Sequence, residues 1–356
     1  LFTGRYPTAH GITRPGTRLE NALKLGQGYP QLAPEIPTLP ELLKAAGWRT
    51  AAFTGGRTVD PRIGFGRGFE TYDSSLVKLS PKKMEPPLGW LTEVRARPFF
   101  LFLHTFEIHA PYLRGDFVEE TLVPEQAEPL RRGLTRLLRQ PGWKSVHDGQ
   151  AILERHQAFT QPVCDALYDG GVLAFDQHLG RLLDWLHAHG LYDRTLIVLT
   201  SDHGEQLGER DGAFYDRHGD TVYDEIVRVP LIVKLPGQRY AGTRVSGVTR
   251  GIDLLPTFLD LAGVRPGTNT GGIQGVTLRP FWELPAQAPR LDAVSEAGIV
   301  YHESKALRTG RQKLILTMSP EQVERLGRAA LPDNPSRREL YDLVADPRET
   351  FDLLGK

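Results

Sequence analysis

The chain has 356 residues, of which 40% are apolar and 24% are charged, as in a large globular domain or a large domain with a small partner. Its 43 basic and 43 acidic residues balance, which argues against a general attraction to nucleic acid or to an anionic membrane surface. The single cysteine, Cys164, excludes an internal disulfide, and no apolar run approaches the length of a membrane span.

The first part of the chain predicts one helix and two strands. Residues 38–47 have the signals of a helix, with Thr38 as the N-terminal capping residue. A strand is expected at 50–54, where a pair of glycines follows it, and another at 99–103, which is rich in phenylalanine and leucine. Residues 57–75 are rich in glycine, arginine and aromatics and indicate a loop.

Residues 165–189 predict the clearest helix. Large apolar residues recur there at alternating steps of four and three, as on one face of a helix, and we expect them in the core. They are Tyr168, Val172, Phe175, Leu179, Leu182 and Leu186. The helix leads into residues 196–199, a short branched apolar run that predicts a strand buried on both faces, as in a parallel sheet.

The last third of the chain changes in character. Residues 228–233 predict another buried strand, and Asp253 is expected to cap a short helix at 253–263. Short strands joined by tight turns then follow, and they predict a small antiparallel subdomain at 290–356. We therefore expect an α/β fold, with a central, mostly parallel sheet flanked by helices in a domain at 1–289.

Polar residues follow two of the predicted strands. Asp202 and His203 come directly after the strand at 196–199, and His109 follows the strand at 99–103. Ligand and metal sites of open α/β sheets gather at the carboxyl ends of the strands. A carboxylate beside an imidazole offers oxygen and nitrogen donors for a divalent cation. The alternatives are a surface Asp-His turn and a solvated loop histidine.

Five short motifs stand in one order along nearly the whole chain. They cover residues 1–7 with 10–11, residues 109–112, residues 201–205, residues 217–219 with 228–230, and a tail at 306–315 and 339–350. In this order they resemble the motifs of the sulfatase family of the alkaline phosphatase superfamily. The resemblance implies an alkaline-phosphatase-like fold and a metal-dependent hydrolase of sulfate esters.

The resemblance also implies a role for each candidate residue. Asp202 and His203 would supply half of a divalent metal site, for which calcium is usual in the family, while an imidazole ligand favours zinc or manganese. His109 would donate to a sulfate oxygen or help to break down a covalent intermediate. His218 would protonate the leaving oxygen, and Arg217, in place of a frequent lysine, would hold a sulfate oxygen.

The sequence departs from the family pattern in three ways. Leu1 comes after the position of the nucleophile, a Cys or Ser converted to formylglycine, so we expect an N-terminally truncated fragment that is inactive by itself. Gly55 and Arg57 occupy the Lys and His positions of a Gly-Lys-x-His motif that many sulfatases carry. His203 stands where the family often has Asn, and Asp-His there also occurs in phosphatases and phosphonate monoester hydrolases.

Two other functions therefore stay open beside sulfate hydrolysis. One is a phosphoryl enzyme of the same fold, such as a phosphonate monoester hydrolase, a phosphodiesterase or a phosphoethanolamine transferase, and the other is a non-catalytic relative. The residues before Leu1 would separate them. The resemblance also implies a formylglycine-generating enzyme as maturation partner if the nucleophile is Cys, and a periplasmic or secreted location. We expect His104 to be a packed strand-end histidine and Cys164 a small packing residue.

Overall fold

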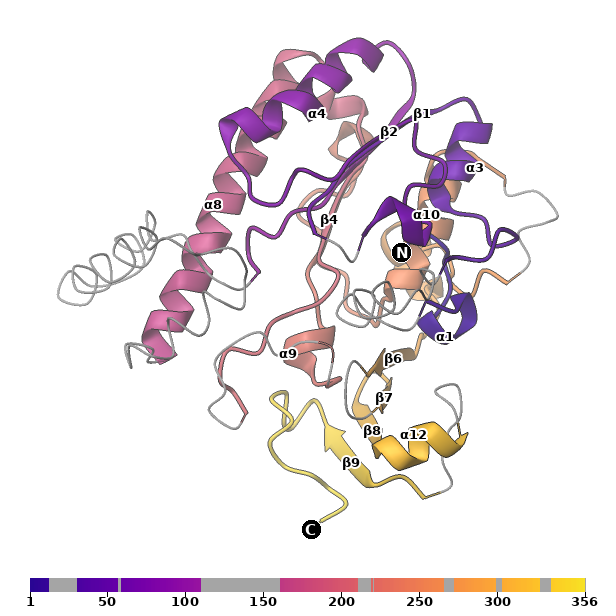
Figure 1. Ribbon diagram of the computed structural model, residues 1–356, viewed down its shortest axis with the longest axis vertical. Helices are drawn as coiled ribbons and strands as arrows, with labels where there is room; N and C mark the ends of the chain where they lie inside the picture. The colour runs from indigo at the N-terminus through magenta and orange to yellow at the C-terminus, as the bar shows by residue number, and fades with distance from the viewer. Residues whose placement is uncertain are drawn as a thin grey trace, which may run out of the picture.

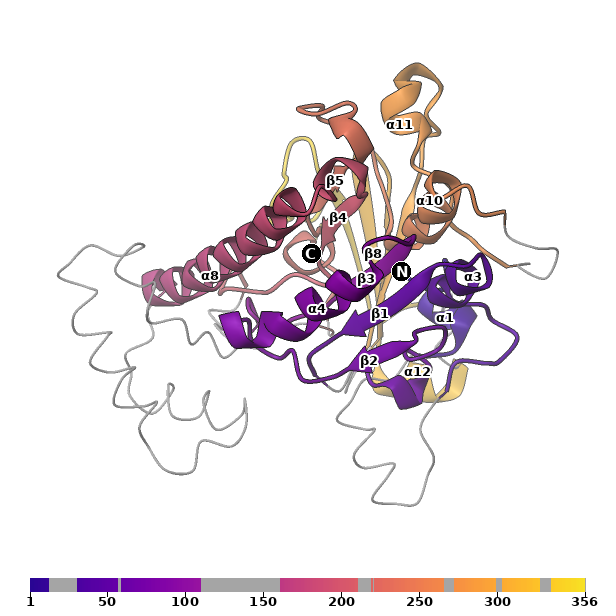
Figure 2. The same cartoon turned by 90° about the horizontal axis from the view of Figure 1, so that it is seen from above.

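The structure is a computed structural model that describes residues 1–12, 31–56, 59–109, 161–210, 219, 221–265, 272–298, 303–326 and 334–355 (Figure 1). Its described strands form three sheets, with three, two and four strands. The four-stranded sheet lies at one end of the molecule (Figure 1), and the long helices α4 (Pro81–Val94) and α8 (Gln161–Ala188) lie together on one side of the parallel sheet (Figure 2). Among these residues, no helix is long and apolar enough to cross a membrane.

The first sheet is parallel and has an apolar centre. β1 (Arg49–Phe53) lies between β2 (Thr71–Asp73) and β3 (Phe99–Leu103). The strands expected at 50–54 and 99–103 are confirmed. β2, however, lies inside the stretch at 57–75 that we expected to be loop, because a three-residue strand is too short to show an alternating pattern.

The described helices are α1 (Pro7–His10), α3 (Leu39–Ala45), α4 (Pro81–Val94), α8 (Gln161–Ala188), α9 (Asp224–Val227), α10 (Leu254–Leu261), α11 (Pro280–Glu283) and α12 (Pro320–Leu326). Four of them, α3, α4, α8 and α10, pack against the parallel sheet, and α12 contacts the four-stranded C-terminal sheet. Single 3-10 turns lie at Pro61–Ile63, Tyr192–Arg194, Pro236–Gln238, Gly251–Asp253 and Pro285–Gln287.

Helix α3 confirms its predicted N-terminus. The backbone N–H of Glu41 donates to Thr38 Oγ1 over 3.4 Å, and the N–H of Thr38 donates to Glu41 Oε2 over 2.9 Å, which is a complete capping box. The apolar side of α3 then packs against α10, where Leu43 and Leu255 are 2% and 0% exposed. Local capping and tertiary burial agree at this helix.

Helix α8 buries the predicted face in its C-terminal part and departs from it nearer its N-terminus. Phe175, Leu182 and Leu186 contact the core shared with α4, as expected. Val172, by contrast, is 40% exposed, while Leu167 is 0% exposed. A helix pattern shows that an apolar stripe exists, but the neighbouring elements decide which edge of the stripe they cover.

The strand that leads to Asp202 differs from its prediction. β4 (Ile197–Thr200) pairs antiparallel with β5 (Leu231–Lys234), and these two form a separate sheet among the described residues. Both are half-buried, and Ile232 is 62% exposed. Among the described residues, β4 therefore has an antiparallel partner and half-buried faces in place of the expected parallel pairing and full burial, because an apolar run specifies neither the direction of the neighbouring strand nor the elements that cover it.

The C-terminal sheet confirms the predicted antiparallel subdomain. β6 (Ala293–Ala297), β7 (Glu303–Arg308), β8 (Gln312–Met318) and β9 (Arg337–Asp342) pair antiparallel in sequence order. The domain boundary at 289/290 stays a prediction.

Asp253 precedes α10 but does not cap it with its side chain. Its carboxylate instead accepts from the Arg250 guanidinium at 2.7 Å and from the N–H of Val276 at 2.9 Å. The expected cap is therefore wrong, because the nearby Arg250 and the distant Val276 N–H occupy the same oxygens.

Candidate active site

The two loops that follow β3 and β4 meet in the structure. The ring centroids of His109 and His203 lie 5.9 Å apart. The structure thus brings together three of the predicted site residues, Asp202, His203 and His109, from segments nearly a hundred residues apart in the chain. Their assigned roles stay predictions. Arg217 and His218 lie outside the described residues, as does Arg57.

Asp202 lies between two imidazole rings. Its Oδ2 is 3.6 Å from His104 Nε2, its Oδ1 is 3.8 Å from His203 Nε2, and its side chain is 57% exposed. Partial burial raises the pKa of Asp202, but the neighbouring imidazoles of His104 and His203 outweigh that effect and hold the pKa well below its ordinary value. Asp202 is therefore an anion that faces solvent.

Hydrogen bonds to backbone carbonyls orient both rings. His104 Nδ1 donates to the carbonyl oxygen of Gly55 over 3.1 Å, and His203 Nδ1 donates to that of Gly204 over 2.9 Å. Because a carbonyl only accepts, each Nδ1 carries the proton and each Nε2 is directed to the carboxylate side. Metal-binding histidines are commonly oriented by such a bond at the other ring nitrogen.

The donors around Asp202 fit part of a metal shell. Asp202 and His203 present an exposed oxygen and an Nε2 toward one side, the two donor types that a divalent cation takes. Among the residues that the structure describes, however, no group of three or more His, Cys, Asp or Glu side chains is arranged to hold a metal ion. Asp202 and His203 therefore need further ligands from elsewhere.

The stretch of residues 201–205, which we call the site turn, rests directly on α9. The N–H of Gly204 donates to the carbonyl oxygen of Ile226 over 2.7 Å. A Cβ added to Gly204 would lie 2.0 Å from the carbonyl oxygen of Glu225. Glycine is required at this position because any side chain would push the site turn off the helix.

The loop that carries His109 is anchored by residues that sequence analysis did not identify. The ammonium of Lys78 donates to the carbonyl oxygens of Phe106, Glu107 and His109, at 3.2 Å for Glu107 and 3.4 Å for His109. The buried carboxylate of Glu107 accepts from the N–H of Leu79 over 2.5 Å. These partners lie about thirty residues apart in sequence, so no local pattern indicates them.

His104 has a larger part in the site than its predicted packing role suggested, because its Nε2 faces Asp202. Its position at the carboxyl end of β3, opposite the site turn, is the signal that could have identified it.

Gly55 explains one departure from the family pattern. A Cβ there would lie 2.6 Å from the carbonyl oxygen of Leu76, so the lysine of a Gly-Lys-x-His motif would not fit.

Comparisons with known proteins cover the whole chain. The sulfatase family model matches residues 1–264, and the model of the N-sulphoglucosamine sulphohydrolase C-terminal region matches residues 210–356. The chain is 35% identical over 190 residues to an N-acetylglucosamine-6-O-sulfatase of Bacteroides thetaiotaomicron, a match covering 53% of this chain and 32% of that protein. It is 32% identical over 216 residues to the multifunctional alkaline phosphatase superfamily protein PehA of Trinickia caryophylli, covering 55% and 40%. These matches span less than half the length of either relative.

Solved structures show the same fold at lower identity. The structure of BT4656 in complex with its substrate D-glucosamine-2-N,6-O-disulfate aligns with a TM-score of 0.66 and 23% identity, covering 100% of this chain and 82% of that one. The phosphonate monoester hydrolase of Agrobacterium radiobacter aligns with a TM-score of 0.63 and 21% identity, covering 99% and 80%. These likenesses show the alkaline-phosphatase-like fold. Because the sulfatase model matches nearly three quarters of the residues, this chain belongs to the sulfatase family.

Proposed function

We propose that this chain provides the catalytic domain of a sulfuric ester hydrolase. The proposal rests on one observation, the meeting of His109 with the site turn, where Asp202 and His203 lie at the carboxyl end of β4. Sulfate ester cleavage places negative charge on the sulfate oxygens and on the leaving oxygen. A site of imidazoles and a cation binder is suited to stabilise those charges.

Each side chain has a defined task in this proposal. A divalent cation held by Asp202, His203 and further ligands would neutralise charge on the sulfate group. His109 donates a hydrogen bond to a sulfate oxygen, and His104 keeps the Asp202 carboxylate oriented and anionic. By family resemblance, Arg217 holds a second sulfate oxygen and His218 protonates the leaving oxygen. The nucleophile, a formylglycine, is expected in residues that precede Leu1.

The metal part is tested by removing its two ligands. In the full-length protein, matured by formylglycine-generating enzyme if the nucleophile is Cys, Asp202→Ala and His203→Ala should each lower aryl sulfate turnover about 100-fold and reduce bound metal. Elemental analysis of purified protein would also identify the ion among calcium, zinc and manganese. Asp193→Ala, exposed near the opposite end of β4, serves as the control. Unchanged metal content in both site variants would contradict the assignment of Asp202 and His203 as metal ligands.

The role of His218 is tested with a series of leaving groups. His218→Ala should slow esters with poor leaving groups far more than activated aryl esters, because an activated leaving group needs little protonation. Equal losses across the series would indicate a structural role instead.

A phosphoryl enzyme is the second candidate, favoured by the relation to PehA and by His203 in the second metal motif. Parallel assays on an aryl sulfate, an aryl phosphate and an aryl phosphonate would rank the two activities. N-acetylglucosamine 6-sulfate belongs in the same panel because a relative is named for that chemistry. Turnover of phosphoryl substrates alone would replace the sulfatase proposal, and no turnover at all would favour a non-catalytic relative.

A further inference from the structure

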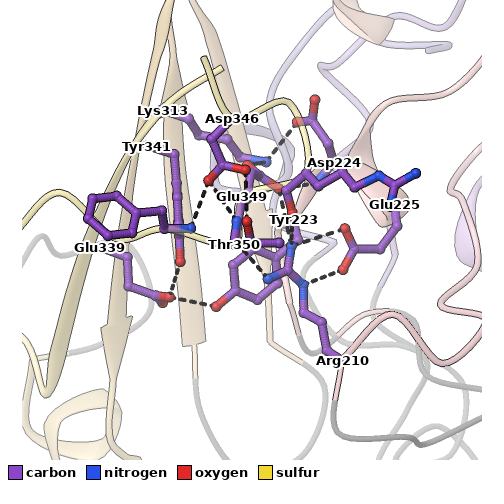
Figure 3. Close-up of polar contacts among 12 residues, drawn as sticks. Arg210, Tyr223, Asp224, Glu225, Lys313, Glu339, Tyr341, Asp346, Glu349 and Thr350 are labelled. Atoms are coloured by element: carbon purple, nitrogen blue, oxygen red, sulfur yellow. Dashed lines mark hydrogen bonds and ion pairs between the residues drawn. The ribbon is translucent and has the colours of Figure 1, made fainter. Parts of the chain in front are cut away.

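A cluster of charged side chains joins α9 to the C-terminal sheet and tail (Figure 3). It pairs three cations with three carboxylates, and we call these six residues the ion cluster: Arg210, Arg308, Lys313, Asp224, Glu225 and Glu349. The side chains of Lys313 and Glu349 are both 0% exposed. A buried charge has lost its hydration, so each of these groups depends on its partners within the cluster.

Lys313 of β8 lies at the centre of the ion cluster. Its Nζ is 2.9 Å from Asp224 Oδ1 and 2.7 Å from Glu349 Oε1. Arg308 of β7 donates from Nη1 to Asp224 Oδ1 over 2.6 Å. Burial alone raises the pKa of Asp224, but Lys313 and Arg308 outweigh it and hold that pKa below its ordinary value. Two strands of the C-terminal sheet therefore hold the first residue of α9.

Glu349 enters the cluster from a tightly shaped loop. The carboxylate of Asp346 accepts from the N–H groups of Thr350 and Phe351, each at 2.7 Å, and so closes the loop (Figure 3). The backbone of Glu349 has a φ of 55°, which is uncommon for a residue with a side chain. Its Oε2 accepts from the N–H of Asp224 over 2.7 Å, which adds a second bond to the start of α9.

Arg210 connects the chain just after the site turn to the same cluster. Its Nε donates to Glu225 Oε1 over 2.5 Å, and its Nη1 donates to the backbone carbonyl of Glu349 over 3.0 Å. The guanidinium carbon also lies 3.4 Å from the centroid of the Tyr223 ring. The segment before α9, like the start of α9 itself, thus contacts the C-terminal tail.

Helix α9 connects the ion cluster to the site turn, because it contacts both. It lies between β4 and the C-terminal strands in Figure 1. The N–H of Gly204 bonds to Ile226, and the space between Gly204 and Glu225 is too small for a methyl group. Because interiors packed this closely transmit displacement, α9 cannot shift without moving the turn that carries Asp202 and His203.

We propose that the ion cluster positions the site turn, with Lys313 and Glu349 acting as positioning residues for the candidate active site. The C-terminal tail is then part of what makes the site competent, although none of its residues is among the candidate site residues. This inference rests on the proposed function, because it takes the site turn as the place of reaction.

The experiment compares Lys313→Met with Arg311→Met in the full-length protein. Methionine keeps the length of Lys313 and removes its charge, whereas Arg311 lies in the turn just before β8 and pairs with Asp342 at the surface, where it is 71% exposed. Both variants would be studied below their unfolding temperatures, established by circular dichroism. If Lys313→Met does not fold, the double variant with Glu349→Gln keeps cations and carboxylates balanced and replaces it.

Two readouts are needed. The first is the imidazole NMR resonance of His203 at fixed pH in ¹⁵N-histidine-labelled protein, assigned by its loss in His203→Gln. The second is steady-state kinetics on an aryl sulfate. We expect Lys313→Met to move the His203 resonance and to lower kcat about 10-fold with a smaller change in KM, because orientation is lost while binding groups stay. Arg311→Met should leave both readouts unchanged.

The two readouts separate this inference from the proposed function. A displaced His203 resonance in a protein whose wild type cleaves no sulfate ester supports the positioning and overturns the proposed function. Wild-type sulfate turnover, with a folded Lys313→Met or double variant that matches Arg311→Met in resonance and kcat, overturns the positioning.

Discussion

The parallel sheet and the C-terminal sheet are stabilised by different kinds of contact. At the centre of the parallel sheet, Ala51 and Ala52 are 0% exposed and Phe53 is 3% exposed, and the buried polar residue beside them, Thr50, is uncharged. Around the C-terminal sheet and tail, charged residues are buried as well, among them Glu303, Lys305, Lys313, Glu339 and Glu349. The first region relies on apolar area removed from water, and the second also relies on paired charges.

The two kinds of contact have different roles in the fold. Apolar packing has no direction and tolerates replacement by a side chain of similar volume. A buried charge requires one particular partner in one particular place, so it specifies how two segments dock. The parallel sheet is therefore stabilised without specific charge partners. The ion cluster, by contrast, determines where the C-terminal sheet contacts α9.

The largest expected effect comes from removing the central cation. Lys313→Met leaves Asp224 and Glu349 without their shared partner, and we expect it to lower the free energy of unfolding by about 3–5 kcal/mol. Urea denaturation followed by circular dichroism would measure the loss. Arg311→Met should cost at most about 1 kcal/mol, because its ion pair with Asp342 is exposed. Equal costs for the two variants would contradict the comparison.

The apolar region should respond to volume instead. Leu255 of α10 is fully buried against α3, and Leu255→Ala should lower the free energy of unfolding by about 2–5 kcal/mol through lost burial and an internal cavity. Leu255→Met keeps the volume and should cost less than about 1.5 kcal/mol. The same denaturation experiment tests both variants. A Leu255→Met loss as large as that of Lys313→Met would remove the distinction between the regions.

Acid should weaken the charged region in a specific way. The pKa of Asp224 lies below its ordinary value of 3.8 in the folded chain, although burial opposes this, because Lys313 and Arg308 favour the anion. Its contribution to stability is therefore complete above pH 3.8 and is lost as the pH falls through the folded pKa. The difference in unfolding free energy between wild type and Asp224→Asn should shrink below that pH, whereas Asp193→Asn should show no such change.

The smallest effect is expected at a local cap in the apolar region. Thr38→Ala removes the capping box of α3 and should lower the unfolding free energy by about 1 kcal/mol. Thr92→Ala on α4 is the control, since its hydroxyl bonds only the carbonyl of Leu88 at an exposed position. Thermal denaturation would detect the difference, and a Thr38→Ala loss no greater than that of Thr92→Ala would show that the cap is dispensable.

Part of the candidate site was predictable from short stretches of sequence. Asp202 and His203 are adjacent, and His109 follows a predicted strand, so the rule that strand ends carry sites was enough to select them. Lys78 and Glu107 could not be selected in this way. Their bonds join loops far apart in the chain, and neither residue stands in a recognisable motif.

The sequence by itself determined the family, the order of the motifs, the capped helix α3 and the antiparallel C-terminal sheet, because each depends on neighbouring residues or on short repeating patterns. Only the tertiary structure decided that β4 pairs antiparallel with β5, which edge of α8 is buried, and which partners the charges at Asp224, Lys313 and Glu349 have. The physical reason is the distance along the chain between the residues that interact. A cap or a strand pattern is satisfied within a few residues, whereas strand direction, burial and ion pairing depend on segments that meet only after the chain has folded.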